Sequence, residues 1–92
     1  INIVSFTHNF KFYFVMYGGY KMSKQQIDLL KKHYKVGSEV ELIRLNDETS
    51  DLKKGDRGII QSVDDIGQIH VDWYNGSSLA LVYQLDEFIV IS

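Results

Sequence analysis

The sequence predicts a mainly β fold: a small five-stranded SH3-like barrel preceded by one short amphipathic helix. From Val36 onward, apolar residues alternate with polar ones and turn residues interrupt the alternation at short intervals, a pattern typical of a small antiparallel barrel. In residues 22–35, just before that point, the apolar residues have helical spacing. The chain has 92 residues, 45% of them hydrophobic, which suffices for one domain with one modest core.

The predicted helix spans residues 22–35. Ser23 and Gln26 have the spacing of a capping box, in which each side chain accepts a hydrogen bond from a free backbone N–H at the helix start. Apolar residues then recur at the spacing of a single stripe: Ile27, Leu30 and Tyr34. Four lysines against one aspartate, Asp28, give the helix a local charge of +3: Lys24, Lys31, Lys32 and Lys35.

Residues 36–92 are predicted to form the barrel. Its strands are expected at 39–45, at 57–63, at 69–74, around 79–81 and at 88–91. On the fourth strand, Leu79 and Leu81 are expected to face inward. The pair Leu42 and Ile43 breaks the alternation and indicates a bulge. Asn75 and Gly76 predict a two-residue hairpin turn with positive φ at both positions. Residues 83–87 are too few for a helix and predict a tight turn.

Residues 1–21 differ in composition from the rest of the chain. They hold seven of the twelve aromatic residues, two lysines and no acid. One hypothesis is that Met22 is the natural start and residues 1–21 are a translated leader, because Gly18 to Met22 can be encoded by a purine-rich ribosome-binding sequence at start-codon spacing. The alternative is a β-hairpin arm that turns at Thr7 to Asn9.

Four sequence runs carry a resemblance to a known family: Gly55–Ile60, Val63–Gly67, Ile69–Leu79 and Asp86–Phe88. In this order they resemble G-x-x-G-x-V, V-D-D-x-G, H-V-x-W-D-N-G-S-S-L and D-x-F of an uncharacterised bacterial domain family. The resemblance covers residues 34–91 and implies an SH3-like barrel. Members of this family are frequent among the genes of phages, plasmids and integrative elements, and the family has no settled activity. The chain departs from the pattern at Tyr74, where an aspartate is usual, and in loop 46–54, which lacks the common prolines.

The sequence carries no signature of an enzyme, a metal site or a cofactor. The absence of cysteine excludes disulfides, thiolate metal sites and a cysteine nucleophile, and it makes a cytoplasmic protein the expectation. Asp64 and Asp65 are adjacent in one turn and, even with Asp72, lack the spaced oxygens of a metal cage. His70 has no cysteine, second histidine or serine at the spacing of a metal or catalytic site. No stretch of the sequence is long and apolar enough to span a membrane.

Binding of a partner protein is therefore the leading expectation. Residues 36–92 contain four basic and eleven acidic side chains, a net charge of −7, which suits a basic segment or patch on a partner. Aromatic rings set among acids hold lysine or arginine by charge and cation–π attraction. The candidate binding residues are Tyr74, Tyr83, Asp72, Asp64, Asp65 and Trp73. Trp73 shares a face with Ile69 and Val71, so a place in the core is its alternative interpretation.

Two other functions stay open. The basic helix predicts a nucleic-acid-binding accessory protein that uses Lys24, Lys31, Lys32 and Lys35, whereas the acidic barrel itself is expected to repel phosphates. The acidic surface also predicts an inhibitor from a mobile element that occupies the DNA-binding groove of a host nuclease or defence complex. The sequence does not predict the oligomeric state.

Overall fold

The computed structural model describes residues 22–46 and 50–91. They form one helix and five strands, α3 (Lys24–His33), β1 (Glu39–Arg44), β2 (Arg57–Val63), β3 (Gln68–Trp73), β4 (Leu81–Val82) and β5 (Glu87–Val90). The predicted mainly β fold with one short helix is confirmed. Both interpretations of residues 1–21 concern a segment outside the described residues.

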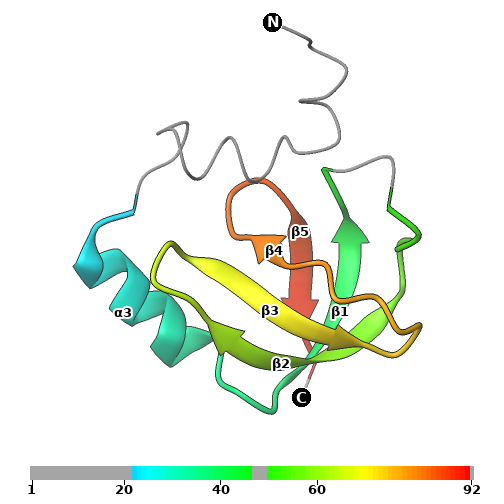
Figure 1. Ribbon diagram of the computed structural model, residues 1–92, viewed down its shortest axis with the longest axis horizontal. Coiled ribbons are helices and arrows are strands. Elements are labelled where there is room, and N and C mark those ends of the chain that lie inside the picture. Colours follow the sequence, from blue (N-terminus) through cyan, green and yellow to red (C-terminus); the bar gives the residue numbers. More distant parts are fainter. Residues whose placement is uncertain (1–21, 47–49, 92) are drawn as a thin grey trace, which may run out of the picture.

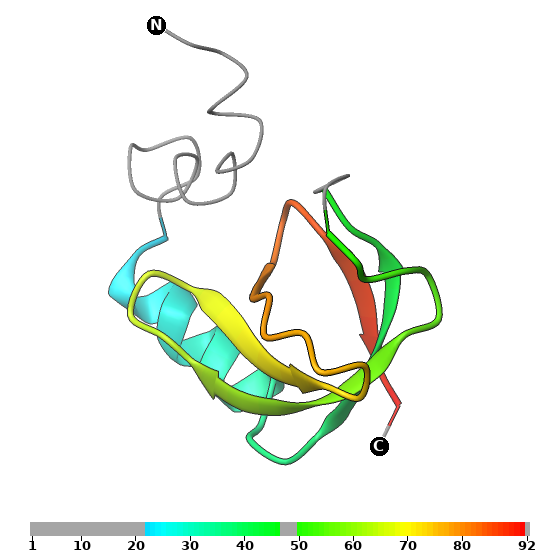
Figure 2. The same ribbon diagram turned by 45° about the vertical axis from the view of Figure 1, so that its right-hand side comes forward.

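The five strands form a single antiparallel sheet in the order β4-β3-β2-β1-β5. The sheet is strongly bent, so that β1 and β5 stand at a steep angle to β2 and β3 (Figure 2). The pairing of β1 with β5 shifts register between Leu42 and Arg44, which confirms the predicted bulge. A second shift lies between Ile60 and Ser62, where β2 pairs with β3. Bulges increase local bending and twist, and so help one sheet to wrap around its core.

The core lies inside this bend and is centred on Trp73. Trp73 is 1% exposed and donates a hydrogen bond from Nε1 to the backbone oxygen of Leu79 at 2.8 Å. In the β2–β3 register it stands opposite Gly58, where an added Cβ would lie 2.6 Å from the backbone oxygen of Asp72. Further core side chains come from every strand except β5: Val40, Leu42, Ile60, Ile69, Val71 and Leu81, together with Leu52 of the loop after β1.

The helix α3 begins and packs as its sequence predicts. Ser23 Oγ accepts from the Gln26 N–H at 3.1 Å, and Gln26 Oε1 accepts from the Ser23 N–H at 2.8 Å, which completes the capping box. Ile27 and Leu30 are buried. The helix lies beside the turn that joins β2 to β3 (Figure 1), where Gly67 leaves room for the side chain of Met22. No helix in the described ranges is long and apolar enough to span a membrane.

The hairpin after β3 differs from the prediction. Among the described residues only glycines have positive φ, so Asn75 does not adopt the conformation expected for it, whereas Gly76 has φ 91°. The Trp73 oxygen accepts from the Gly76 N–H at 2.9 Å, and the Trp73 N–H donates to the Ser77 oxygen at 3.3 Å. The prediction of a two-residue turn with positive φ at both positions is therefore wrong.

The fourth strand is correspondingly shorter than expected. Leu79 precedes β4 and is only partly buried, whereas Leu81 is fully buried. The Ser77 N–H donates to Asn75 Oδ1 and the Leu79 N–H donates to Ser77 Oγ, so side chains satisfy donors that a longer strand would use in the ladder. Local hydrogen bonding by Asn and Ser thus replaces strand pairing over this segment.

Substitution of Gly58 by alanine tests the close approach of β2 to β3 beneath Trp73. The added methyl group would overlap the Asp72 oxygen and Val71 Cγ1, both 2.6 Å from its position. We expect Gly58→Ala to lower the free energy of unfolding by about 1–3 kcal/mol, the usual cost of overpacking, measured by urea denaturation. The exposed Gln61→Ala in the same strand serves as the control, with an expected change within about 0.5 kcal/mol. Equal stability of the two variants would contradict this description of the core.

Candidate functional site

The structure divides the predicted binding residues among separate places. Tyr74 is 62% exposed, and its hydroxyl donates to Glu39 Oε2 at 2.7 Å. This hydrogen bond, together with desolvation and the Glu39 charge, raises the pKa of Tyr74 against a lowering effect of Arg57. The strand register places Glu39, Ile59 and Asp72 in one row, so Asp72 lies on the same outer face as Glu39. Tyr74 and Asp72 therefore belong to one acidic surface on the outside of the sheet.

Asp64 and Asp65 serve the turn before β3. Asp64 Oδ1 accepts from the Ile66 N–H at 3.1 Å and from the Gln68 N–H at 2.8 Å, and Oδ2 lies 2.8 Å from His70 Nε2. Asp65 forms an ion pair with Lys31 at 3.1 Å, which links the turn to α3. Asp64 is thus a structural group of the turn, whereas Asp65 is exposed and makes a surface ion pair with α3.

The four lysines of the basic helix differ in whether they form an ion pair. All four are exposed, and Lys31 also forms an ion pair with Asp65. An exposed ion pair contributes little to stability, but it lowers the net charge that this side of α3 offers to a phosphate.

Tyr83 lies in an aromatic cluster that the sequence did not predict as a unit. Its ring centroid is 6.0 Å from that of Tyr34, and the Tyr34 centroid is 5.3 Å from that of Phe88. Tyr34 is the C-cap residue of α3, Tyr83 follows β4 and Phe88 belongs to β5. The fold thus brings Tyr34, at the end of α3, against two rings from the C-terminal part of the chain. Tyr34 was predicted only as part of the helix stripe, so its sequence spacing gave no sign of this contact.

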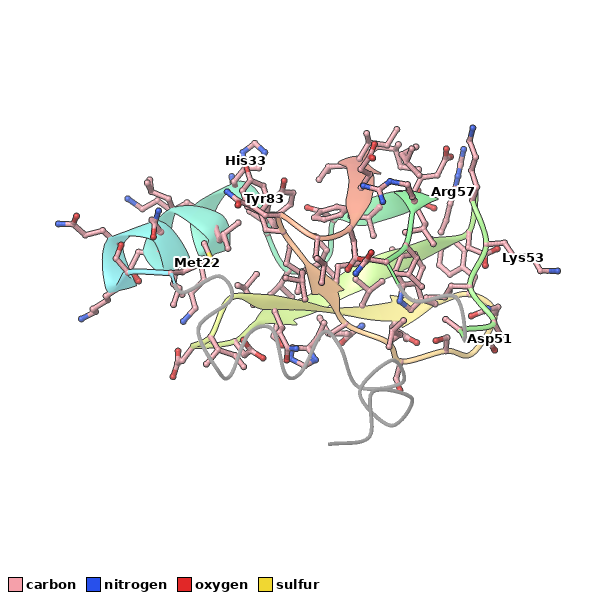
Figure 3. All side chains as sticks on the ribbon, turned by 90° about the horizontal axis from the view of Figure 1, so that it is seen from above. Met22, His33, Asp51, Lys53, Arg57 and Tyr83 are labelled. Atoms are coloured by element: carbon pink, nitrogen blue, oxygen red, sulfur yellow. The ribbon has the colours of Figure 1, made fainter. Side chains whose placement is uncertain are left out.

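Two hollows adjoin the cluster and form what we call the aromatic groove. A hollow of about 430 Å³ is lined by Met22, Gln26, Leu29, Leu30, His33, Tyr34, Tyr83 and Gln84. A second, of about 220 Å³, is lined by Tyr34, Ile43, Tyr83, Asp86, Glu87, Phe88 and Ile89. Tyr34 and Tyr83 line both hollows, of which the larger lies against α3 and the smaller against β5. Figure 3 shows Tyr83 beside His33, and Arg57 well away from both. The Tyr74 N–H donates to the Arg57 oxygen at 2.9 Å, so Tyr74 lies near Arg57 and outside the groove.

Two carboxylates stand at the β5 end of the groove. Asp86 is 4% exposed; its Oδ1 accepts from the Asn46 N–H at 2.8 Å and its Oδ2 from the Val82 N–H at 2.9 Å. Glu87 is exposed and pairs with Arg44 at 2.7 Å. The Val82 oxygen also accepts from the Leu85 and Asp86 N–H groups, which closes the predicted tight turn. Asp86 therefore fixes the segment that carries Tyr83 relative to the strand that carries Phe88.

The Tyr34 ring offers the groove a neutral surface at physiological pH. Burial raises the pKa of Tyr34, and the neighbouring Tyr83 raises it further. The Tyr34 phenol thus stays uncharged well above pH 7.

Among residues 22–46 and 50–91, no group of three or more His, Asp or Glu side chains could hold a metal ion. The smaller hollow combines the rings of Tyr34, Tyr83 and Phe88 with the carboxylates of Asp86 and Glu87.

Comparison with known proteins places this fold in a family. Residues 23–91 match the model of a domain of unknown function, DUF4314. The chain belongs to this family. The DUF4314 match spans α3 and all five strands, and it includes every residue of the aromatic groove except Met22. The resemblance to an uncharacterised domain family is thereby confirmed. Searches of curated proteins and of solved structures found no match.

Replacement of Asp86 by asparagine tests its role in holding the groove. The asparagine side chain has the same shape as aspartate but only one acceptor oxygen. The N–H groups of Asn46 and Val82 each need an acceptor, so one of them would lose its hydrogen bond. We expect Asp86→Asn to lower the free energy of unfolding by about 2 kcal/mol in urea denaturation, the cost of a buried unsatisfied donor. Glu87→Gln is the matched control; it breaks an exposed ion pair and should change stability by less than about 1 kcal/mol. Similar losses in the two variants would rule out this role.

Proposed function

We propose that this DUF4314 domain is a non-catalytic binding module that recognises a basic segment of a partner protein through the aromatic groove. The observation that supports this most is the convergence of Tyr34, Tyr83 and Phe88 beside the carboxylates of Asp86 and Glu87. A lysine or arginine side chain would place its charge near these carboxylates and its methylene groups against the rings.

The charge distribution of the barrel supports a basic partner. Both arginines of the barrel are engaged in ion pairs, Arg44 with Glu87 at 2.7 Å and Arg57 with Glu41 at 2.9 Å. Lys53 lies at the far side of the molecule from Tyr83 (Figure 3). Among the described residues, the groove is lined by two carboxylates, Asp86 and Glu87, and by no lysine or arginine, which favours a basic segment over an acidic one.

Binding of a labelled peptide of alternating lysine and valine tests the proposal by fluorescence anisotropy. We expect Tyr83→Ala to weaken binding about tenfold, because it removes one ring of the cluster. Tyr74→Ala, an exposed tyrosine outside the groove, is the matched control and should leave affinity unchanged. A peptide with glutamate in place of lysine should not bind. Loss of binding in Tyr74→Ala but not in Tyr83→Ala would move the site to the outer face of the sheet.

The outer face supports a second candidate, an inhibitor from a phage or mobile element that occupies the DNA-binding groove of a host nuclease. Here the row of Glu39 and Asp72 beside Tyr74 would stand in for phosphates. The purified chain would then slow the cleavage of a labelled duplex in a bacterial extract, and Asp72→Asn would relieve the inhibition. Undiminished cleavage at saturating chain would dismiss this candidate.

Direct nucleic-acid binding by α3 is the weakest of the three. Lys31 is already paired with Asp65, and the chain as a whole has a net charge of −2. Since phosphate neutralisation supplies most non-specific affinity, we expect no retardation of duplex DNA in a gel-shift at low salt. A retarded band that Lys24→Ala and Lys32→Ala abolish would reinstate the basic helix as the binding surface.

A further inference from the structure

The two edges of the sheet differ in how their backbone groups are satisfied. At the β4 edge, the Val82 N–H donates to Asp86 Oδ2 at 2.9 Å and the Val82 oxygen accepts from the N–H groups of Leu85 and Asp86. The turn that follows β4 thus closes this edge. An edge closed in this way cannot pair with another strand.

The β5 edge is open. The Ile91 N–H donates to the Glu39 oxygen at 2.9 Å, and the register pairs Ile89 with Glu41. Because bonding alternates along an antiparallel strand, the N–H and C=O groups of Phe88 and Val90 point away from β1. Within the described part of the chain, no strand pairs with β5 on that side.

The open edge adjoins the aromatic groove. Phe88 and Ile89 point to opposite faces of β5, yet both line the hollow of about 220 Å³ together with Asp86 and Glu87, so this hollow passes from one face to the other at the start of the strand. Ile89 and Val90 are 48% and 40% exposed. Natural edges are commonly protected by lysine or proline, and β5, of sequence EFIV, contains neither.

We infer that the partner segment binds in extended form as an added strand on β5, with one basic side chain in the hollow between Tyr83 and Glu87. This inference rests on the proposed function and adds its binding mode. Backbone pairing with Phe88 and Val90 would supply sequence-independent affinity. The exposed carboxylate of Glu87 would select lysine or arginine at the position that enters the hollow, where the incoming cation would take the place of Arg44 in its ion pair.

The substitution Val90→Pro tests strand addition, since it deletes a backbone N–H that β1 does not use. Proline is tolerated on an edge strand where its nitrogen faces outward. We expect Val90→Pro to weaken binding of the lysine–valine peptide about tenfold, from the lost hydrogen bond and the obstructed edge. Val90→Ala, which shortens the side chain and keeps the N–H, should bind within about threefold of the original chain.

Amide hydrogen exchange on the unsubstituted chain gives a second measurement that does not depend on the folding of a proline variant. Saturation with the peptide should slow exchange at Phe88 and Val90, while Ile89 and Ile91 are protected with or without it. If Tyr83→Ala weakens binding but Val90→Pro does not and exchange at Phe88 and Val90 is unchanged, strand addition is overturned and the proposed function stands. If the peptide does not bind the chain at all, the proposed function itself fails.

Discussion

The carboxylate of Asp86 is the contact on which the candidate site depends. It is buried and joins three segments: it accepts from Asn46 after β1 and from Val82 of β4, and it directly precedes β5. Through these bonds it closes one sheet edge, shapes the turn that carries Tyr83 and sets the start of the strand that carries Phe88. A buried carboxylate satisfied by backbone donors specifies one arrangement, because any other leaves donors unpaired in the interior.

The core below this contact explains why the sheet bends where it does. Gly58 lets β3 approach β2 beneath the indole of Trp73, and register shifts near Leu42 and Ile60 allow each strand to turn. The indole N–H holds the Leu79 oxygen, which keeps the irregular segment before β4 against the core. The bend then brings β5 near the end of α3, so that Tyr34 meets Phe88. The aromatic groove is thus a consequence of how the core closes.

Alternation and capping in the sequence predicted the elements well, because these patterns depend on neighbours in the chain. The sequence correctly predicted the capping box of Ser23 and the bulge at Leu42. It also predicted that Ile69, Val71 and Trp73 face the core. The turn after Trp73 was not, since side-chain bonds from Asn75 and Ser77 compete with strand pairing. The aromatic groove was not either: Tyr34 meets Tyr83 and Phe88 only through tertiary packing, for which local spacing carries no signal.

Mapping of backbone amide shifts by NMR during titration with the lysine–valine peptide tests the account most directly, because it locates the binding surface without any substitution. We expect the perturbed amides to gather at Tyr34, at residues 83–90 and along the adjoining end of α3. Perturbations gathered instead around Asp72 and Tyr74, on the outer face of the sheet, would contradict it.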